Sequence, residues 1–244
     1  IKYNYNPSAS NNWSVWLISD SSPTSFVENA DARSGFALGV NLSGSDDTSI
    51  RIWDTATGAC RSLLHGHVAG ITSLCASPDG RFLVSGSRDT TIRLWDIASG
   101  RCLRTFEERT SPITALCCSP DFRYILSGSA DCRLRLWETD TGRCTQIFSG
   151  HRQKITSVCM SADSRFALSG GEDKQIAFWE LAGGRCLHML EAHAFGVTAV
   201  AMSRNGRYAF SAGRDSIIKK WALDWELAEP APPAEDARLS ILFE

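Results

Sequence analysis

Three sets of serine, histidine and aspartate recur in the sequence with identical spacing. In each set a histidine is followed after 18 residues by a serine and after 22 residues by an aspartate, and a tryptophan stands six residues beyond the aspartate. Serine, histidine and aspartate are the residue types of a nucleophilic triad. Three equally spaced copies, each with an adjoining tryptophan, favour a structural role over catalysis. The sets are His67, Ser85, Asp89 and Trp95; His151, Ser169, Asp173 and Trp179; and His193, Ser211, Asp215 and Trp221.

The tryptophans mark an internal repeat with a period of 42 residues. The repeat positions are Trp53, Trp95, Trp137, Trp179 and Trp221. A fixed period of this length indicates one supersecondary unit stacked several times. The third unit keeps Ser127, Asp131 and Trp137 but has Arg109 where the others have histidine. Two alternatives stay open for Arg109: it pairs with Asp131, or it points outward and contacts a partner.

One repeat, residues 66–107, predicts four short strands. Its alternating and β-branched segments are separated by turn residues, among them Ser77-Pro78-Asp79-Gly80, in which proline and glycine favour a tight turn. No segment shows helical periodicity. Four antiparallel strands joined by hairpin turns and repeated in series are the pattern of a propeller blade. The expected strands are ITSLCAS (71–77), FLVSGS (82–87), TIRLW (91–95) and CLRTF (102–106).

The motifs GH (66–67), SPDG (77–80) and SGSRDTTIRLWD (85–96), kept in register by the period, resemble the WD-repeat family of β-propellers. The resemblance covers about residues 43–222. It implies an all-β propeller of about five 42-residue repeats with four antiparallel strands each. It also implies that each Trp–Ser–His–Asp set forms a hydrogen-bonded network, as buried indole and hydroxyl groups require. In the third blade this network contains Ser127, Asp131 and Trp137.

The family usually closes a ring with seven blades, so five repeats are few. The chain starts with Ile1 rather than methionine, and we expect it to be part of a longer protein with further blades upstream. A smaller closed ring, or an open arc completed by another chain, are the alternatives. We divide the sequence into a degenerate segment that supplies the inner strands of the first blade (1–42), the repeats (43–222), a Pro-rich acidic insertion (223–236) and a closing outer strand (237–244).

Composition argues against several classes of partner. The formal net charge is −2 and the pI about 6.2, so no nucleic-acid partner is expected. No apolar run approaches the roughly 20 residues needed to cross a bilayer, so no membrane partner is expected either. A cation recurs on the third strand of four repeats, which we interpret as a solvated edge. These cations are Arg51, Arg93, Arg135 and Lys219.

The nine cysteines include seven at equivalent repeat positions, where a small apolar residue packs well. Equivalent positions lie on different units and cannot pair, and no CxxC pair suggests a metal. We therefore expect no metal, no cofactor and an intracellular, cytoplasmic location, with a nuclear or ciliary one also compatible. The seven are Cys60, Cys102, Cys144 and Cys186, and Cys75, Cys117 and Cys159.

The sequence favours a non-enzymatic scaffold that docks partner proteins or peptides on the loop face of the propeller, within a larger protein or complex. The resemblance implies that this face is lined by the residues after each GH pair and by the residue before each hairpin aspartate. Aromatic and arginine side chains are the usual anchors of interfaces. The candidate partner-binding residues are Arg88, Arg109, Arg152, Lys154, Phe195 and Arg214.

Asp46 and Glu172 interrupt this basic surface, so the expected ligand is an acidic or carboxylate-bearing protein segment. One alternative is a structural component of a large cytoskeletal or ciliary assembly. A second alternative is a propeller-based hydrolase. The hydrolase is disfavoured because the innermost strands carry apolar or hydroxylic residues rather than the acidic residues that such a site needs.

Overall fold

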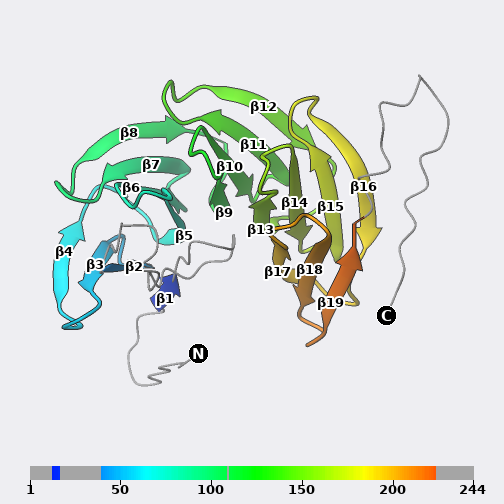
Figure 1. Ribbon diagram of the computed structural model, residues 1–244, viewed down its shortest axis with the longest axis horizontal. Coiled ribbons are helices and arrows are strands. Elements are labelled where there is room, and N and C mark those ends of the chain that lie inside the picture. The colour runs from blue at the N-terminus through cyan, green and yellow to red at the C-terminus, as the bar shows by residue number, and fades with distance from the viewer. Residues whose placement is uncertain (1–12, 17–39, 109, 224–244) are drawn as a thin grey trace. The chain divides into compact units, whose positions relative to one another are not determined.

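The computed structural model describes residues 13–16, 40–108 and 110–223. In this part of the chain all regular structure is β-strand, and nineteen strands form five antiparallel sheets (Figure 1). No helix that could cross a bilayer occurs in it. The all-β class and the repeated sheets of a propeller are thereby confirmed. The chain divides into two compact units, residues 1–20 with 25–113 and residues 21–24 with 114–244.

The first unit contains two four-stranded blades. The first blade consists of β1 (Trp13–Trp16), β2 (Val40–Ser45), β3 (Ile50–Asp54) and β4 (Cys60–Leu64). The second blade consists of β5 (Ile71–Ala76), β6 (Phe82–Ser87), β7 (Thr91–Asp96) and β8 (Cys102–Glu107). Each strand pairs with its sequence neighbour.

A shared apolar core joins these two blades. Leu42 and Ile52 of the first blade cluster with Ile71, Leu74 and Trp95 of the second, and all five are at least nine-tenths buried. The apolar residues of one strand face thus meet those of the next sheet, as the period-two alternation requires. β1 lies within the segment 1–42 that we expect to supply the inner strands of the first blade, and β2 begins near the end of that segment. Residues 1–12 and 17–39 lie outside the described part.

The second unit contains three blades, the first of which begins at the unit boundary. The third blade consists of β9 (Ile113–Cys118), β10 (Tyr124–Ser129), β11 (Arg133–Glu138) and β12 (Cys144–Ser149). The fourth blade consists of β13 (Ile155–Met160), β14 (Phe166–Gly171), β15 (Gln175–Glu180) and β16 (Arg185–Glu191). The fifth blade has three described strands, β17 (Val197–Met202), β18 (Tyr208–Gly213) and β19 (Ile218–Ala222).

Neighbouring blades of the second unit are joined by apolar packing and by hydrogen bonds. Leu168 and Phe178 of the fourth blade cluster with Val200 of the fifth. The Thr114 hydroxyl donates to the carbonyl of Ile155 at 2.6 Å, and the equivalent Thr156 donates to the carbonyl of Val197 at 2.6 Å. Each inner strand is therefore tied to the next one by a repeated hydroxyl–carbonyl contact.

The turn between the second and third strand of every blade places a non-glycine residue at positive φ. In the second blade this residue is Thr90, at φ 70°. The left-handed region costs an L-residue roughly 1–2 kcal/mol. The preceding Asp89 offsets the cost, because its carboxylate accepts the backbone N–H of Thr91 at 2.9 Å. The equivalent residues are Thr48, Cys132, Lys174 and Ser216.

The outer strands begin at a β-bulge that exposes a cysteine. The register shifts between Leu94 and Trp95, so that Trp95 lies opposite Cys102, and the same shift occurs in the first, third and fourth blades. Cys60, Cys102, Cys144 and Cys186 are exposed. The expectation that these four pack as small apolar residues is therefore wrong. It holds for the inner-strand residues Cys117 and Cys159, which are buried, and Cys75 is half-buried.

Candidate functional site

The second blade shows how its Ser, His, Asp and Trp are arranged. The Trp95 indole N–H donates to the Ser85 hydroxyl at 2.8 Å, and the same hydroxyl lies 2.7 Å from Nε2 of His67. His67 Nδ1 lies 2.8 Å from the Asp89 carboxylate. With Nδ1–H donating to the carboxylate, Nε2 accepts the serine proton. The hydrogen bonds then all have the same direction, from the donor Trp95 to the final acceptor Asp89, and every donor has an acceptor.

The fourth and fifth blades repeat this chain of contacts. His151 lies 2.9 Å from Asp173 and 2.7 Å from Ser169, and Trp179 donates to Ser169 at 2.8 Å. In the fifth blade the three corresponding distances are 2.9, 2.8 and 3.0 Å. The residues concerned are His193, Asp215, Ser211 and Trp221. The structure thus brings together all three sets identified by their spacing.

The electrostatics of His67 and Asp89 agree with a neutral imidazole and an ionised carboxylate. Burial lowers the pKa of His67 below its ordinary value, and the guanidinium of Arg93 acts in the same direction against the attraction of Asp89. Burial alone would raise the pKa of Asp89. Hydrogen bonds from Thr91, His67 and the backbone N–H of Val68 outweigh burial, so the pKa of Asp89 lies below its usual range.

The networks contain the residue types of a catalytic triad, but their serines are not accessible to a substrate. Ser85 and Ser169 are 0% exposed and Ser211 is 1% exposed. Each hydroxyl also accepts an indole N–H, which occupies one of its two lone pairs and fixes the side chain inside the sheet. A substrate carbonyl cannot reach these serines without opening the sheet. The geometry is that of a structural network.

In the third blade a different residue type binds the hairpin aspartate. Its Trp137 indole donates to Ser127 at 2.9 Å, as in the other blades. The carboxylate of Asp131 is bound by the guanidinium of Arg135 at 2.7 Å. Arg135 is 5% exposed, so the expectation that it lies on a solvated edge is wrong. Arg109, the residue at the histidine position, lies outside the described residues.

The first blade resembles the third in this respect. Trp53 donates to Ser43 at 2.8 Å, and Arg51 pairs with Asp47 at 3.2 Å. An arginine four residues after the hairpin aspartate therefore binds it in both blades in which the described residues place no histidine on it. In the second blade, where His67 holds the aspartate, the equivalent Arg93 lies over the Trp95 ring at 6.0 Å. An arginine at i+4 from the aspartate together with a missing histidine was the available sequence signal.

The same aspartates hold the loop that follows each GH position. Besides the histidine, each carboxylate accepts the backbone N–H of the next loop residue, at 3.0 Å for Val68, 2.9 Å for Arg152 and 3.1 Å for Ala194. The loops are fixed a second time by backbone bonds, Arg88 N–H to Gly70 O at 3.0 Å and Arg214 N–H to Gly196 O at 2.9 Å. The side chains of these loops therefore project from a rigid backbone.

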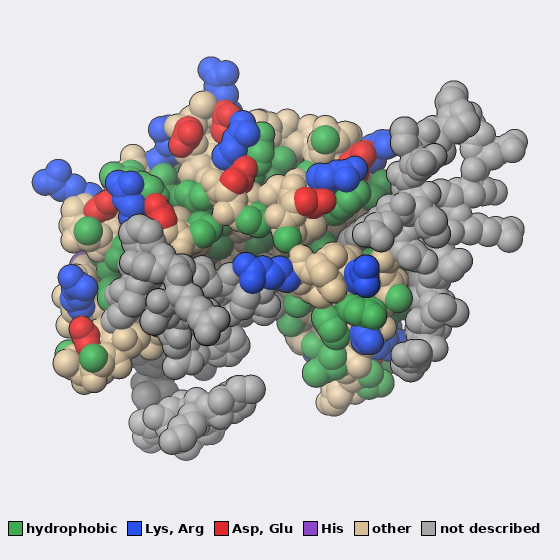
Figure 2. All heavy atoms as spheres, in the orientation of Figure 1, with side chains coloured by type: hydrophobic (Ala, Val, Ile, Leu, Met, Phe, Trp, Pro, Cys, Tyr) green, Lys and Arg blue, Asp and Glu red, His purple; other side chains and the backbone are tan. Residues whose placement is uncertain are grey.

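Opposite charges at equivalent positions pair between neighbouring blades. In the first unit, Arg88 lies 3.3 Å from Asp46. In the second unit, Glu172 accepts from Arg214 of the fifth blade at 3.4 Å, and also from Lys154 of its own blade at 3.3 Å. Three of the predicted contact residues thus have acidic neighbours. Figure 2 likewise shows Lys and Arg side chains beside Asp and Glu side chains on the visible face, with hydrophobic side chains between them.

Two predicted contact residues of the second unit are more open. Phe195 is 60% exposed. Arg152 is exposed, and its hydrogen bond to Asp173 is made by its backbone N–H rather than by its side chain. The Phe195 loop lies next to Glu172, because a Cβ on Gly196 would meet the Glu172 backbone at 3.2 Å. The Arg152 loop also lies next to Glu172, because the Glu172 N–H donates to the Lys154 carbonyl at 2.9 Å. We call Arg152, Lys154, Glu172, Phe195 and Arg214 the second-unit rim.

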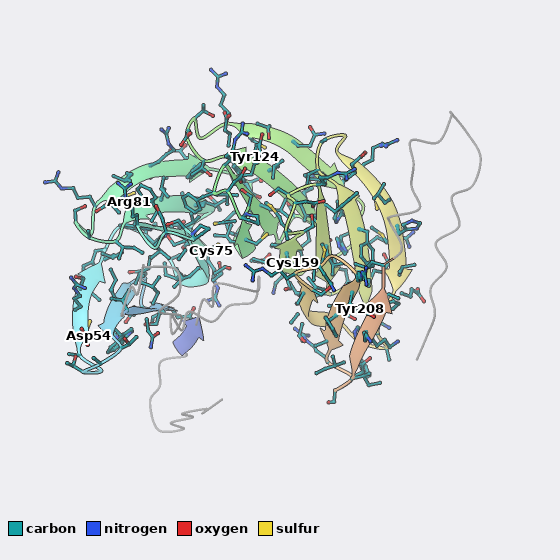
Figure 3. All side chains as sticks on the ribbon, in the orientation of Figure 1. Asp54, Cys75, Arg81, Tyr124, Cys159 and Tyr208 are labelled. Atoms are coloured by element: carbon teal, nitrogen blue, oxygen red, sulfur yellow. The ribbon has the colours of Figure 1, made fainter. Side chains whose placement is uncertain are left out.

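No group of three or more metal-type ligands occurs in the described part of the chain. The cysteines there are free thiols. Cys159 illustrates how inert such a buried thiol is, because burial raises its pKa to about 12. Figure 3 marks it on the inner strand β13.

Comparison with known proteins identifies related sequences. A segment of 59 residues is 39% identical to Nuclear distribution protein PAC1 of Coccidioides posadasii (strain C735), covering 24% of this chain and 12% of that protein. A segment of 43 residues is 49% identical to Nuclear distribution protein PAC1-2 of Uncinocarpus reesii (strain UAMH 1704), covering 18% of this chain and 9% of that protein. The matches thus span about one repeat and a small fraction of either relative.

The family model described as "WD domain, G-beta repeat" matches four successive segments, residues 58–96, 100–138, 142–180 and 184–222. These segments cover more than half of the chain and share the 42-residue offset of the blades. Together with the five sheets and their tryptophan–serine contacts, they show that the chain belongs to the WD-repeat family.

Proposed function

We propose that this chain is a non-enzymatic interaction module that docks an acidic segment of a partner protein on the second-unit rim. The observation that supports it most is that Phe195 and Arg152 are both exposed, on two loops whose backbone N–H groups are held by buried aspartates. Aromatic and arginine residues bring the largest contact area and the most hydrogen-bond donors per residue to an interface. A rigid loop also loses little conformational entropy on binding.

The charge of the second-unit rim favours an acidic ligand. It contains three cations, Arg152, Lys154 and Arg214, and one anion, Glu172. The anion pairs with Lys154 and Arg214. Exposed pairs of this kind stabilise a fold by only about 0–1 kcal/mol. A carboxylate of the partner can therefore share these cations at little cost, and Arg152 is open to it from the start.

The sealed serines argue against the hydrolase alternative. A fluorophosphonate probe reacts with a serine that is both activated and accessible. We expect no labelling of Ser85, Ser169 or Ser211 in the folded chain, because each is buried and accepts an indole N–H. Stoichiometric labelling of any of them would establish a nucleophile and overturn this assignment.

The docking proposal is tested by Phe195→Ala and Arg152→Ala. The matched control is Arg204→Ala, because Arg204 is also exposed but lies in the turn after β17, at the other end of that strand. Proteins captured from cells by each variant are compared by quantitative mass spectrometry. A set of partners lost with both rim variants and kept with the control is the expected result. Identical partner sets for all three variants, with unchanged melting curves, would place the binding surface elsewhere.

A second candidate is a part in nuclear distribution, the role that the names of the relatives state. Matches of about one repeat support the blade more than the role, so this stays second to the general docking function. The cytoskeletal or ciliary assembly and the intracellular location also remain predictions. Co-sedimentation of the tagged chain with a nuclear or cytoskeletal fraction, weighed against a cytosolic one, tests them.

A further inference from the structure

The fifth blade ends in a strand that has only one partner among the described residues. β19 pairs with β18 on one side, while the third strand of every other blade pairs on both sides. The consequence is visible at Ile218, which is 76% exposed. The equivalent residues of the other blades are 0–1% exposed; they are Ile50, Ile92, Leu134 and Ile176. An exposed edge with apolar side chains is a site for strand addition.

The four complete blades specify what lies opposite this position. The third-strand residue always faces a large apolar residue of the outer strand: Ile50 faces Leu64, Ile92 faces Phe106, Leu134 faces Phe148 and Ile176 faces Leu190. Two residues further along, the pair combines one apolar and one polar residue, such as Leu94 with Arg104 or Phe178 with His188. A strand that completes the fifth blade must satisfy both rules.

We propose that residues 237–244 occupy this edge as the fourth strand of the fifth blade, antiparallel to β19, with Phe243 opposite Ile218. These residues, ARLSILFE, lie outside the described part of the chain. The register follows from placing Phe243 at the position of Phe106 and Phe148. It sets Leu242 opposite Lys219 and Ile241 opposite Lys220.

The pair of Lys220 with Ile241 supports the register independently. At the position of Lys220 the other blades have an apolar residue, and opposite it they have a polar one. In the fifth blade the two residue types are swapped: Lys220 is the polar member and Ile241 the apolar one. The pair therefore still combines one apolar and one polar residue. The Lys220 ammonium lies 4.2 Å from the centre of the ring of Tyr208, which Figure 3 marks on β18. A shift of the register by one residue breaks one rule in either direction: it places Ser240 opposite Lys220, or it places Glu244 opposite Ile218.

The intervening segment fits a connection rather than a strand. Five residues, 97–101, join β7 to β8. Here 14 residues, 223–236, stand between β19 and Ala237, and they include Pro230, Pro232 and Pro233. Proline is excluded from paired strand interiors. Lengthening a loop by this amount adds only about 1 kcal/mol of closure entropy.

A cross-strand disulfide in the full chain tests the register. Lys219→Cys with Leu242→Cys places two thiols directly opposite each other, within the Cα separation that a disulfide spans. Lys219→Cys with Ile241→Cys is the off-register control. After mild oxidation, linked peptides identified by mass spectrometry should show an intramolecular bond in the first variant and several-fold less in the second. Absence of the first bond, a stronger bond in the control, or bonds only between two copies would each overturn the proposal.

Hydrogen exchange provides a readout that does not depend on added cysteines. Phe243→Asp should accelerate exchange of the β19 amides at least about tenfold, because the edge loses its partner strand. Ser240→Asp is the control, since the equivalent Leu103 of the second blade is 52% exposed and tolerates a polar side chain. Unchanged β19 exchange in Phe243→Asp would show that another strand, from a partner or from elsewhere in the chain, covers this edge.

Discussion

Replacing Asp173 by alanine tests the network at its most connected residue. Its carboxylate lies 2.9 Å from His151 Nδ1, accepts the backbone N–H of Arg152 at 2.9 Å and that of Gln175 at 3.2 Å, and its side chain is 5% exposed. Alanine leaves the buried His151 donor without an acceptor and frees two backbone donors. An unmatched buried donor costs about 1–3 kcal/mol, and with the lost charged hydrogen bonds we expect a total loss of about 2–4 kcal/mol.

Asp163→Ala is the matched control in the same blade. Asp163 also accepts a backbone N–H, from Arg165 at 3.0 Å, but it lies in an exposed turn. Its second donor, Ser161, keeps the carbonyl of Phe166 as an acceptor at 3.1 Å after the change. No buried donor is stranded, so we expect a loss of no more than about 0.5–1 kcal/mol.

Urea unfolding followed by tryptophan fluorescence measures the difference. At an ordinary slope for a domain of this size, the midpoint of Asp173→Ala should fall by about 1 M or more, and that of Asp163→Ala by less than about 0.5 M. Asp173→Asn, which keeps one acceptor oxygen, should lie between them. Equal midpoints for Asp173→Ala and Asp163→Ala would refute the view that the aspartate is held in a satisfied buried network.

Three further results are expected. Because burial lowers the pKa of His67 in the folded state, the unfolded chain binds more protons below about pH 6.5, so the free energy of unfolding should fall as the pH drops through that value and less so in His67→Gln; an unchanged pH profile would contradict a neutral buried imidazole. Arg135→Ala should cost about 1–3 kcal/mol in thermal or urea unfolding, and Arg133→Ala, at the exposed start of the same strand, less than about 0.5 kcal/mol. Equal losses would contradict a stabilising contribution from the buried Arg135–Asp131 pair. In the native chain Cys102 should be alkylated within minutes and Cys159 only after unfolding, as peptide mass spectrometry will show; simultaneous modification would mean that the fourth blade opens readily.

The strands were predictable because the repeat makes each segment a replicate of the others. An alternating run such as residues 71–77 is ambiguous alone, but four such runs in one phase, each followed by an equivalent turn, favour a single interpretation. The spacing between His67 and Asp89 placed the two residues correctly because the turn chemistry fixes the hairpin, and the hairpin fixes the register. Both facts are local and repeat without insertion in the second, fourth and fifth blades.

Side-chain environment at a repeated position was less predictable than the position itself. The four outer-strand cysteines share a phase, and phase alone suggested packing. A bulge beside each tryptophan, a feature of backbone register, turns them outward instead. Arg135 was wrongly expected on a solvated edge for a different reason. Its burial depends on which group binds Asp131, and that depends on the replacement of the repeat's histidine by Arg109.

The hairpin positions of Arg88 and Arg214 were predictable from the repeat, but their pairing with acidic residues was not. Arg88 and Arg214 were chosen for their position before the hairpin aspartate, and both lie there. Each is matched by an acidic residue at the same position of the preceding blade, Asp46 and Glu172. Such pairs leave a trace in the sequence as opposite charges 42 residues apart, but contact between them depends on how closely adjacent loops approach.

The aspartates that hold both the histidines and the loop amides connect the interior to the rim. A lesion at Asp215, for example, would release the backbone N–H of Ala194 and with it the loop that carries Phe195. The loop, no longer held, would have to adopt its binding conformation at each encounter with a ligand. This slows association and shortens the lifetime of the complex. In a genetic screen for lost binding, alleles of the buried network would therefore be recovered beside alleles of the rim itself. Lowering the temperature would distinguish the two classes. Alleles of the buried network should regain binding on cooling, and alleles of the rim should not.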